Sequence, residues 1–290
     1  MGIVAQVIVT GVVTGSFYAL VAAAMQLVYD SARILNFGQG GLVVSGMFAM
    51  WWLNTSRGVD PWLSLLLLIP IGAALGALFY LVVVRPLEDR HHIQVAIATL
   101  AGGSIFVGLY AKLFGSSVKV VDPFLSGGSI HVGSVTITPQ SIVVVIGSTL
   151  IVLALAAFFR FTWTGLAMRA NAENREGVRV VGASPSRINL ATFVVSGTVS
   201  ALAGGLIVPI LGARFDFGNN LVLVAFVSAV LGGLTSTMGS AFGGLAVGLS
   251  SAAIAAIFGS DFQYFWLLAV VLPLILFRPN GVFGRHVQEE

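Results

Sequence analysis

The sequence predicts an all-α integral membrane protein, because charged residues are scarce and lie in short clusters. Only 9% of the 290 residues are Asp, Glu, Lys or Arg, whereas soluble domains carry about 25%. Mean hydropathy is +1.00, and 57% of the residues are hydrophobic. The uncharged runs are continuously apolar rather than alternating, which favours helices over the strands of a membrane barrel. Residues 1–290 are therefore expected to form one polytopic membrane domain.

About nine membrane-spanning helices are predicted, since a helix needs about 20 apolar residues to cross the hydrocarbon core. Most uncharged runs supply one helix. In the run 123–159 the first part is polar and glycine-rich, so we expect a loop there and a helix from Pro139 onward. The run 217–260 is long enough for two helices joined by a turn. The expected spans are 3–29, 36–54, 62–84, 93–113, 139–160, 188–211, 218–236, 241–258 and 262–277.

The orientation is predicted from the basic residues, which concentrate in cytoplasmic loops. The first span has no basic region ahead of it, which favours a retained helix over a cleaved signal peptide. With the amino terminus outside, ten basic residues fall in inside loops: Arg33, Arg85, Arg90, Arg160, Arg169, Arg175, Arg179, Arg187, Arg278 and Arg285. Four fall outside: Arg57, Lys112, Lys119 and Arg214. The prediction is therefore N-out and C-in.

A short internal echo suggests a repeat. Arg33-Ile-Leu-Asn-Phe-Gly38 follows the first span, and Arg214-Phe-Asp-Phe-Gly218 follows the sixth. In the nine-span arrangement these segments lie on opposite sides of the membrane. They would suit an inverted repeat of four spans, one linker span and four spans. A chance likeness of two residues is the alternative.

The sequence argues against catalysis and ion coupling. There is no cysteine, which excludes disulfides, thiolate metal sites and cysteine nucleophiles. Every Asp and Glu lies at or beyond a predicted span end, whereas ion-driven carriers place such groups within their spans. The adjacent His91 and His92 are poorly spaced for a helical metal site. We expect no catalytic residue, no metal and no cofactor, and the absence of a basic face excludes nucleic acid as a partner.

Two segments are candidates for function. Within residues 36–41, three glycines and two amides weaken a helix start and expose backbone groups. Broken helices of this kind form substrate sites in transporters, although a reverse turn between two spans is the alternative. Segment 161–187 is the largest predicted cytoplasmic segment, with Thr164 or Asn171 as helix caps and Gly182 as a stop. It is either a solvated basic loop or a docking surface for a soluble partner.

Five ordered motifs extend from residue 11 to residue 284. They are 11–20 (GVVTGSFYAL), 36–40 (NFGQG), 165–174 (GLAMRANAEN), 231–244 (LGGLTSTMGSAFGG) and 278–284 (RPNGVFG). Together they resemble the permease subunits of branched-chain amino-acid ABC importers, the LivH/LivM family, and the LivH type above all. Asn174 stands where that family often has Asp, and the fourth motif is two to three residues longer than the common form.

The resemblance implies the permease subunit of an ATP-driven importer for branched-chain or related amino acids, in the bacterial plasma (inner) membrane. No GxxxxGK[ST] phosphate loop is present, so ATP would be hydrolysed by other chains. The implied partners are a second, LivM-like permease, two cytoplasmic ATP-binding subunits and an extracytoplasmic solute-binding protein. Whether the two permeases are identical, and which small solute is carried, stays open.

The resemblance also assigns candidate roles to residues. Coupling to the ATPases is expected of Arg169, Glu173, Asn174 and Gly182, and lining of the translocation path is expected of Asn36, Gln39, Gly40 and Gly41. The alternative function is an ATP-independent carrier or facilitator for a small polar solute such as urea or an amide.

Overall fold

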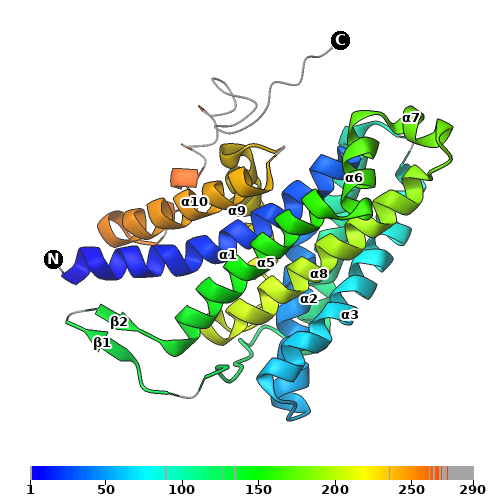
Figure 1. Cartoon of the computed structure of the whole chain (residues 1–290). Coiled ribbons are helices and arrows are strands. Elements are labelled where there is room, and N and C mark those ends of the chain that lie inside the picture. Colours follow the sequence, from blue (N-terminus) through cyan, green and yellow to red (C-terminus); the bar gives the residue numbers. More distant parts are fainter. Residues whose placement is uncertain are drawn as a thin grey trace.

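The computed structural model describes residues 2–267 without residues 89, 126, 134, 235, 261 and 264, and it also describes residues 269 and 273. It is a helical bundle with one short β-hairpin at one end (Figure 1). Six of the described helices are long and apolar enough to cross a membrane, which confirms the all-α membrane class. The ninth predicted span and the basic residues Arg278 and Arg285 lie largely outside the described residues.

The other predicted spans coincide with helical stretches. These are α1 (Gly2–Ala32), α2 (Gln39–Trp51) with a π-helical turn (Trp52–Ser56), α3 (Pro61–Phe79) with a π-helical and a 3₁₀ turn (Tyr80–Val84, Arg85–Leu87), α4 (His92–Phe114), α5 (Pro139–Phe161), α8 (Pro185–Leu211), α9 (Phe217–Gly232) and α10 (Thr237–Phe258). Segment 161–187 contains α6 (Trp163–Glu173) and α7 (Arg175–Val180). Strands β1 (Ile130–Val132) and β2 (Val135–Ile137) pair antiparallel in the predicted loop.

Local sequence signals explain where several helices begin. α3 starts at Pro61, and the Asp60 carboxylate accepts hydrogen bonds from the Trp62 and Leu63 N–H groups at 2.9 and 3.2 Å. α5 starts at Pro139, as predicted, behind an N-cap threonine. In both helices a proline occupies a first-turn position whose N–H would lack a helical partner in any case.

Glycines set how closely the long helices approach. α1 packs antiparallel to α10, and a Cβ added at Gly248 would lie 2.2 Å from the backbone of Gly15. α3 packs against α8, where a Cβ at Gly76 would lie 2.1 Å from the carbonyl oxygen of Phe193. Small residues permit such contacts in membranes, where packing rather than hydrophobicity drives helix association. The helices α1–α3 and α8–α10 thus form two units that contact each other reciprocally. The first helix of one unit packs on the last helix of the other, as α1 on α10, and α3 likewise packs on α8.

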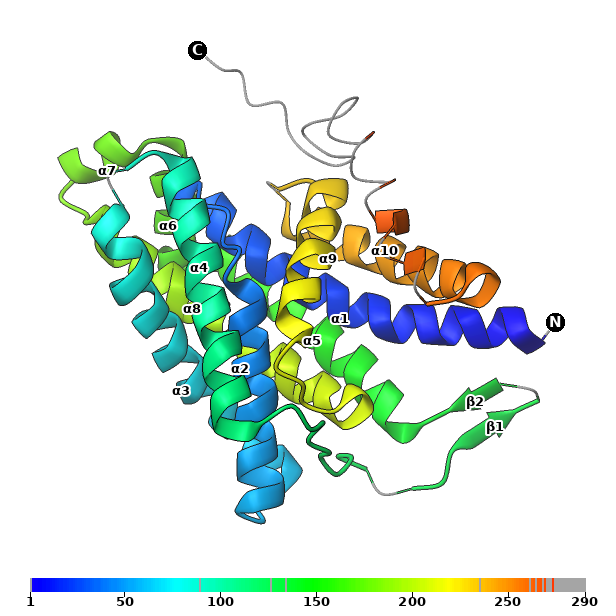
Figure 2. The same ribbon diagram turned by 180° about the vertical axis from the view of Figure 1, so that it is seen from behind.

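Helices α2 and α9 both begin in the interior of the bundle. Gln39, the first residue of α2, hydrogen-bonds to Ser196 and Ser200 near the middle of α8. Phe217, the first residue of α9, stacks on Phe17 at the middle of α1, with 6.2 Å between ring centroids. From this common depth α2 and α9 run toward opposite ends of the bundle (Figure 2).

These two helices are shorter than predicted. α2 has 13 residues before its π-helical turn, and α9 has 16. At about 1.5 Å of rise per residue, each regular helix covers only part of a hydrocarbon core of about 30 Å. Because α2 continues through its π-helical turn to Ser56, the full crossings at 36–54 and 218–236 stay predictions. Hydropathy does not detect these interior starts, because the charges of the connections, at Arg33, Arg214 and Asp216, mark the end of a span but not its depth.

Candidate functional site

The break between α1 and α2 is held by two buried amides. Arg33 adopts the left-handed conformation (φ 56°) that ends α1. Asn36 and Gln39 have no exposed surface. The Asn36 Nδ2 atom donates to Gln39 Oε1 at 3.0 Å, and Asn36 Oδ1 accepts from the Gly38 N–H at 3.0 Å. The Asn36 side chain thus replaces a helical partner that the interrupted backbone lacks.

Gln39 connects this break to α8. Its Nε2 atom donates to Ser200 Oγ, and its Oε1 atom accepts from Ser196 Oγ at 3.2 Å. On the other side, the Phe37 N–H donates to Thr99 Oγ1 of α4 at 3.1 Å. Buried amides are costly unless hydrogen-bonded, and here the two side chains bond to each other and to α8, while α4 holds the backbone between them. The two amides therefore tie the break into the bundle.

The two glycines that follow lie at helix contacts. A Cβ at Gly40 would come within 2.0 Å of the Gly218 carbonyl oxygen, and one at Gly41 within 3.1 Å of the Gly103 oxygen. All four residues predicted to line a path, Asn36, Gln39, Gly40 and Gly41, are thus buried between helices of this chain. Their predicted role as path-lining residues stays a prediction.

Segment 161–187 forms a pair of helices that projects from one end of the bundle (Figure 1). Thr162 caps α6 by accepting from the Gly165 N–H at 3.0 Å, and Asn174 caps α7 by accepting from the Gly177 N–H at 2.7 Å. The prediction of Thr164 or Asn171 as the cap was wrong, because α6 begins at Trp163 directly after the end of α5 at Phe161. Gly182 (φ 85°) follows the end of α7, as predicted.

The predicted coupling residues of this segment are all exposed: Arg169, Glu173, Asn174 and Gly182. Two apolar neighbours, Val180 and Val181, are 86% and 80% exposed at the tip of the segment. Sequence reasoning missed these valines. The sequence signal that could have identified them is an apolar pair inside an otherwise basic stretch.

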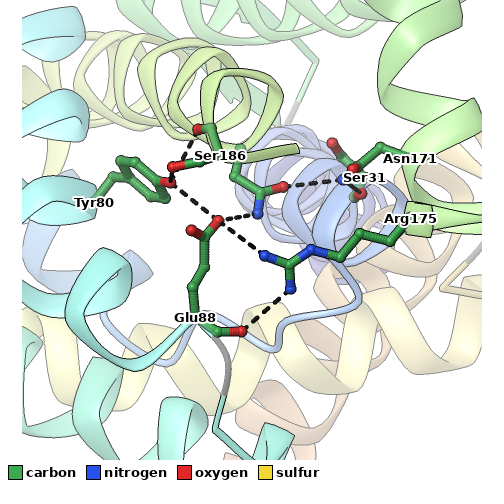
Figure 3. A network of polar contacts seen from close by, with 7 residues as sticks. Ser31, Tyr80, Glu88, Asn171, Arg175 and Ser186 are labelled. Atoms are coloured by element: carbon green, nitrogen blue, oxygen red, sulfur yellow. Dashed lines mark hydrogen bonds and ion pairs between the residues drawn. The ribbon is translucent and has the colours of Figure 1, made fainter. Parts of the chain in front are cut away.

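A buried polar network anchors the segment to the bundle (Figure 3). Asn171 of α6 donates through Nδ2 to the Ser31 carbonyl oxygen of α1 at 2.8 Å and to Asn189 Oδ1 of α8 at 3.1 Å. Ser31 Oγ and Thr192 Oγ1 lie 2.6 Å apart. Because Ser31 lies just before the break and Asn189 lies on α8, α6 is connected directly to the two helices beside the break.

Glu88 is the centre of the same network. Its Oε1 atom accepts hydrogen bonds from Asn189 Nδ2 and, at 3.0 Å, from the Tyr80 hydroxyl. Arg175 of α7 lies 3.7 Å from the same oxygen and donates to the Glu88 backbone carbonyl at 3.2 Å. The Glu88 side chain is 8% exposed. A charge buried with several donors is stabilised as long as all of them stay in place. Sequence reasoning missed this role, since Glu88 stands in an ordinary charged cluster.

The fold and the site define a class: a multi-pass membrane protein with two helices that begin in the interior of the bundle and an exposed helical segment anchored to α1 and α8. Interrupted helices of this type are characteristic of transport proteins. A family model described as branched-chain amino acid transport system / permease component matches residues 7–285. The chain belongs to this family, which confirms the resemblance of its motifs.

Individual relatives agree with this result. The chain is 30% identical to the high-affinity branched-chain amino acid transport system permease protein LivH of Escherichia coli, over 98% of this chain and 97% of that protein. It is 28% identical to the permease protein BraD of Pseudomonas aeruginosa over the same shares. It is also 30% identical to the fructose import permease protein FruF of Bifidobacterium longum, over 80% of this chain and 64% of that protein.

Proposed function

We propose that this chain is the permease subunit of an ATP-driven (ABC) importer for branched-chain or related amino acids in the bacterial plasma membrane. Membership of the permease family over residues 7–285 supports the transport role. The observation that carries the ATP-driven mechanism is the exposed α6–α7 segment with its buried anchor. An exposed apolar tip outside the hydrocarbon fits a protein partner, and the network of Glu88 and Asn171 links the α6–α7 segment to α1 and α8.

The distribution of basic residues supports the orientation. Eight arginines lie at the end of the bundle with α6 and α7: Arg33, Arg85, Arg90, Arg160, Arg169, Arg175, Arg179 and Arg187. Four basic residues belong to the end with the hairpin: Arg57, Lys112, Lys119 and Arg214. By the positive-inside rule the α6–α7 end is cytoplasmic. The amino terminus, at the opposite end of α1, is then outside.

In this proposal the cytoplasmic ATPases dock on the α6–α7 segment. Val180 and Val181 enter an apolar site on the ATPase, while Arg169 and Glu173 match charges around it. Asn174 and Gly182 maintain the conformation of the docking segment, because Asn174 caps α7 and Gly182 turns the chain after it. Two such ATPases, a second LivM-like permease and an extracytoplasmic solute-binding protein complete the importer.

The translocation path is proposed to run beside the meeting point of α2 and α9. Asn36, Gln39, Gly40 and Gly41 would line it in a conformation in which α2 and α9 separate. The unit α1–α3 packs reciprocally against the unit α8–α10, and α2 and α9 run in opposite directions. Both features support the inverted repeat, in which α5 would be the linker. Movement of α6 would then reach the break through Ser31 and Asn189.

The test of this proposal is a charge reversal on the docking surface. Glu173→Lys should abolish L-leucine-stimulated ATPase activity and copurification of the ATPases, because the partner surface would meet the wrong charge. Asp122→Lys makes the same change at an exposed position near the hairpin and should leave copurification intact. L-leucine uptake into vesicles that persists without any ATPase chain would instead establish the ATP-independent carrier.

A further inference from the structure

The first turn of α9 exposes two amides. Asn219 and Asn220 are exposed, as is Leu223 one turn further along the same face, which is 49% exposed. Most of the remaining α9 residues are buried. α9 therefore presents a narrow stripe to the outside of the chain, polar at its start and apolar beyond it.

This stripe begins at the middle of the bundle. The preceding residue, Gly218, lies against Gly40, and Phe217 stacks on Phe17 at the centre of α1. Gly40 in turn adjoins Gln39, whose partners flank the centre of α8. The contacts of Phe217 and Gly218 thus place Asn219 and Asn220 near the middle of the bundle, a few residues after the exposed Arg214–Asp216 ion pair.

Hydrocarbon is an unsuitable neighbour for these amides. Burying an amide without a hydrogen bond costs roughly 2–7 kcal/mol, and neither side chain hydrogen-bonds to a residue that the structure describes. Exposed polar residues on the outer helices behave differently. Ser104 of α4 donates to its own helix at Leu100 O, and Thr149 of α5 donates to Val145 O. Such back-bonding satisfies hydroxyls against lipid, and neither asparagine makes it.

We propose that Asn219 and Asn220 line the water-filled route and bind the charged end of a zwitterionic amino acid, with Leu223 against its apolar side chain. Each amide offers two donor hydrogens and one acceptor oxygen, which suits a carboxylate beside an ammonium group. An apolar surface one helical turn away suits a branched hydrocarbon side chain rather than a sugar. This inference rests on the proposed transport function and gives it a binding surface.

The first test uses the absence of cysteine from the chain. In the complete importer in vesicles, Asn220→Cys should react with a small charged methanethiosulfonate reagent at least tenfold faster than two controls. These are Ile105→Cys, on the apolar outer face of α4 and 70% exposed, and Ala203→Cys, which is buried in α8. L-leucine should slow the reaction. A rate equal to that of Ile105→Cys, or one that L-leucine leaves unchanged, would overturn the inference in favour of lipid or a second permease.

The second test measures transport. Asn219→Ala combined with Asn220→Ala should raise the KM for L-leucine uptake at least tenfold, while thermal stability and copurification of the ATPases stay unchanged. Thr149→Ala, which also removes an exposed polar group, should leave the KM unaltered. An unchanged KM in the double variant, with ATPases still copurified, would refute the binding surface and leave the importer assignment standing. If wild-type protein copurifies no ATPase, the proposed function itself fails.

Discussion

The first turns of α2 and α9 carry similar chemistry in opposite surroundings. Each has two amides at mid-depth, and the two turns touch through Gly40 and Gly218. At α2 the amides are fully buried and hydrogen-bonded. At α9 both amides are exposed and make no hydrogen bond among the described residues. Residue type alone therefore does not say whether an amide in a membrane protein supports the fold or faces a solute.

The difference comes from the neighbouring helices. α4 and α8 enclose the start of α2, and they supply Thr99, Ser196 and Ser200 as hydrogen-bond partners. The start of α9 packs on α1 and α2 with one face only, and no described helix covers the other face. The same pair of helices therefore holds a structural site on one side and, in our proposal, a solute surface on the other.

The largest effect is expected from Gly40→Val, which breaks the contact that the two turns share. A Cβ would lie 2.0 Å from the Gly218 carbonyl oxygen, and the backbones cannot separate without disturbing α8. We expect a loss of about 3 kcal/mol, at the upper end for overpacking, seen as a lower thermal midpoint in detergent. Gly108→Val, at a helical glycine with open space around it, is the control. Equal midpoints for the two variants would contradict the packing described.

A smaller effect is expected from variants that distinguish the two amide pairs, Asn36–Gln39 and Asn219–Asn220. Gln39→Leu leaves the buried Asn36 Nδ2 without its partner, at about 1–3 kcal/mol, while Ser196 and Ser200 keep other hydrogen bonds. Thermal stability should fall. Asn220→Leu should keep normal stability and alter the ranking of transported amino acids. A stability loss in Asn220→Leu equal to that in Gln39→Leu would show that the two pairs are alike.

The smallest effect is expected from Ser200→Ala, which removes only one partner of Gln39. About 1 kcal/mol should be lost. The double variant Gln39→Leu with Ser200→Ala should lose less free energy of unfolding than the sum of the two single losses, since both variants remove the same hydrogen bond. The measurement is a double-mutant cycle on thermal unfolding. Strict additivity would mean that the Gln39–Ser200 contact contributes no free energy.

By itself the sequence determined the membrane class, the approximate position of most helices and the family. Those features depend on local signals: uncharged runs, a proline at the start of α5, small residues four apart and ordered motifs. The exposed position of segment 161–187 followed from the same pattern of charge. The exposed pair Val180–Val181 and the caps at Thr162 and Asn174 were not identified from the sequence.

Tertiary structure alone decided which polar groups are structural. Gln39 and Ser200 are 161 residues apart, and Glu88 and Asn189 are 101 apart. Hydropathy along the chain contains no information about such pairs. The starts of α2 and α9 inside the bundle were likewise not predicted, because the charges of Arg33, Arg214 and Asp216 mark a connection between helices but not its depth. Burial of a polar side chain depends on partners brought together by folding, and only the folded chain shows whether Asn36 or Asn219 has them.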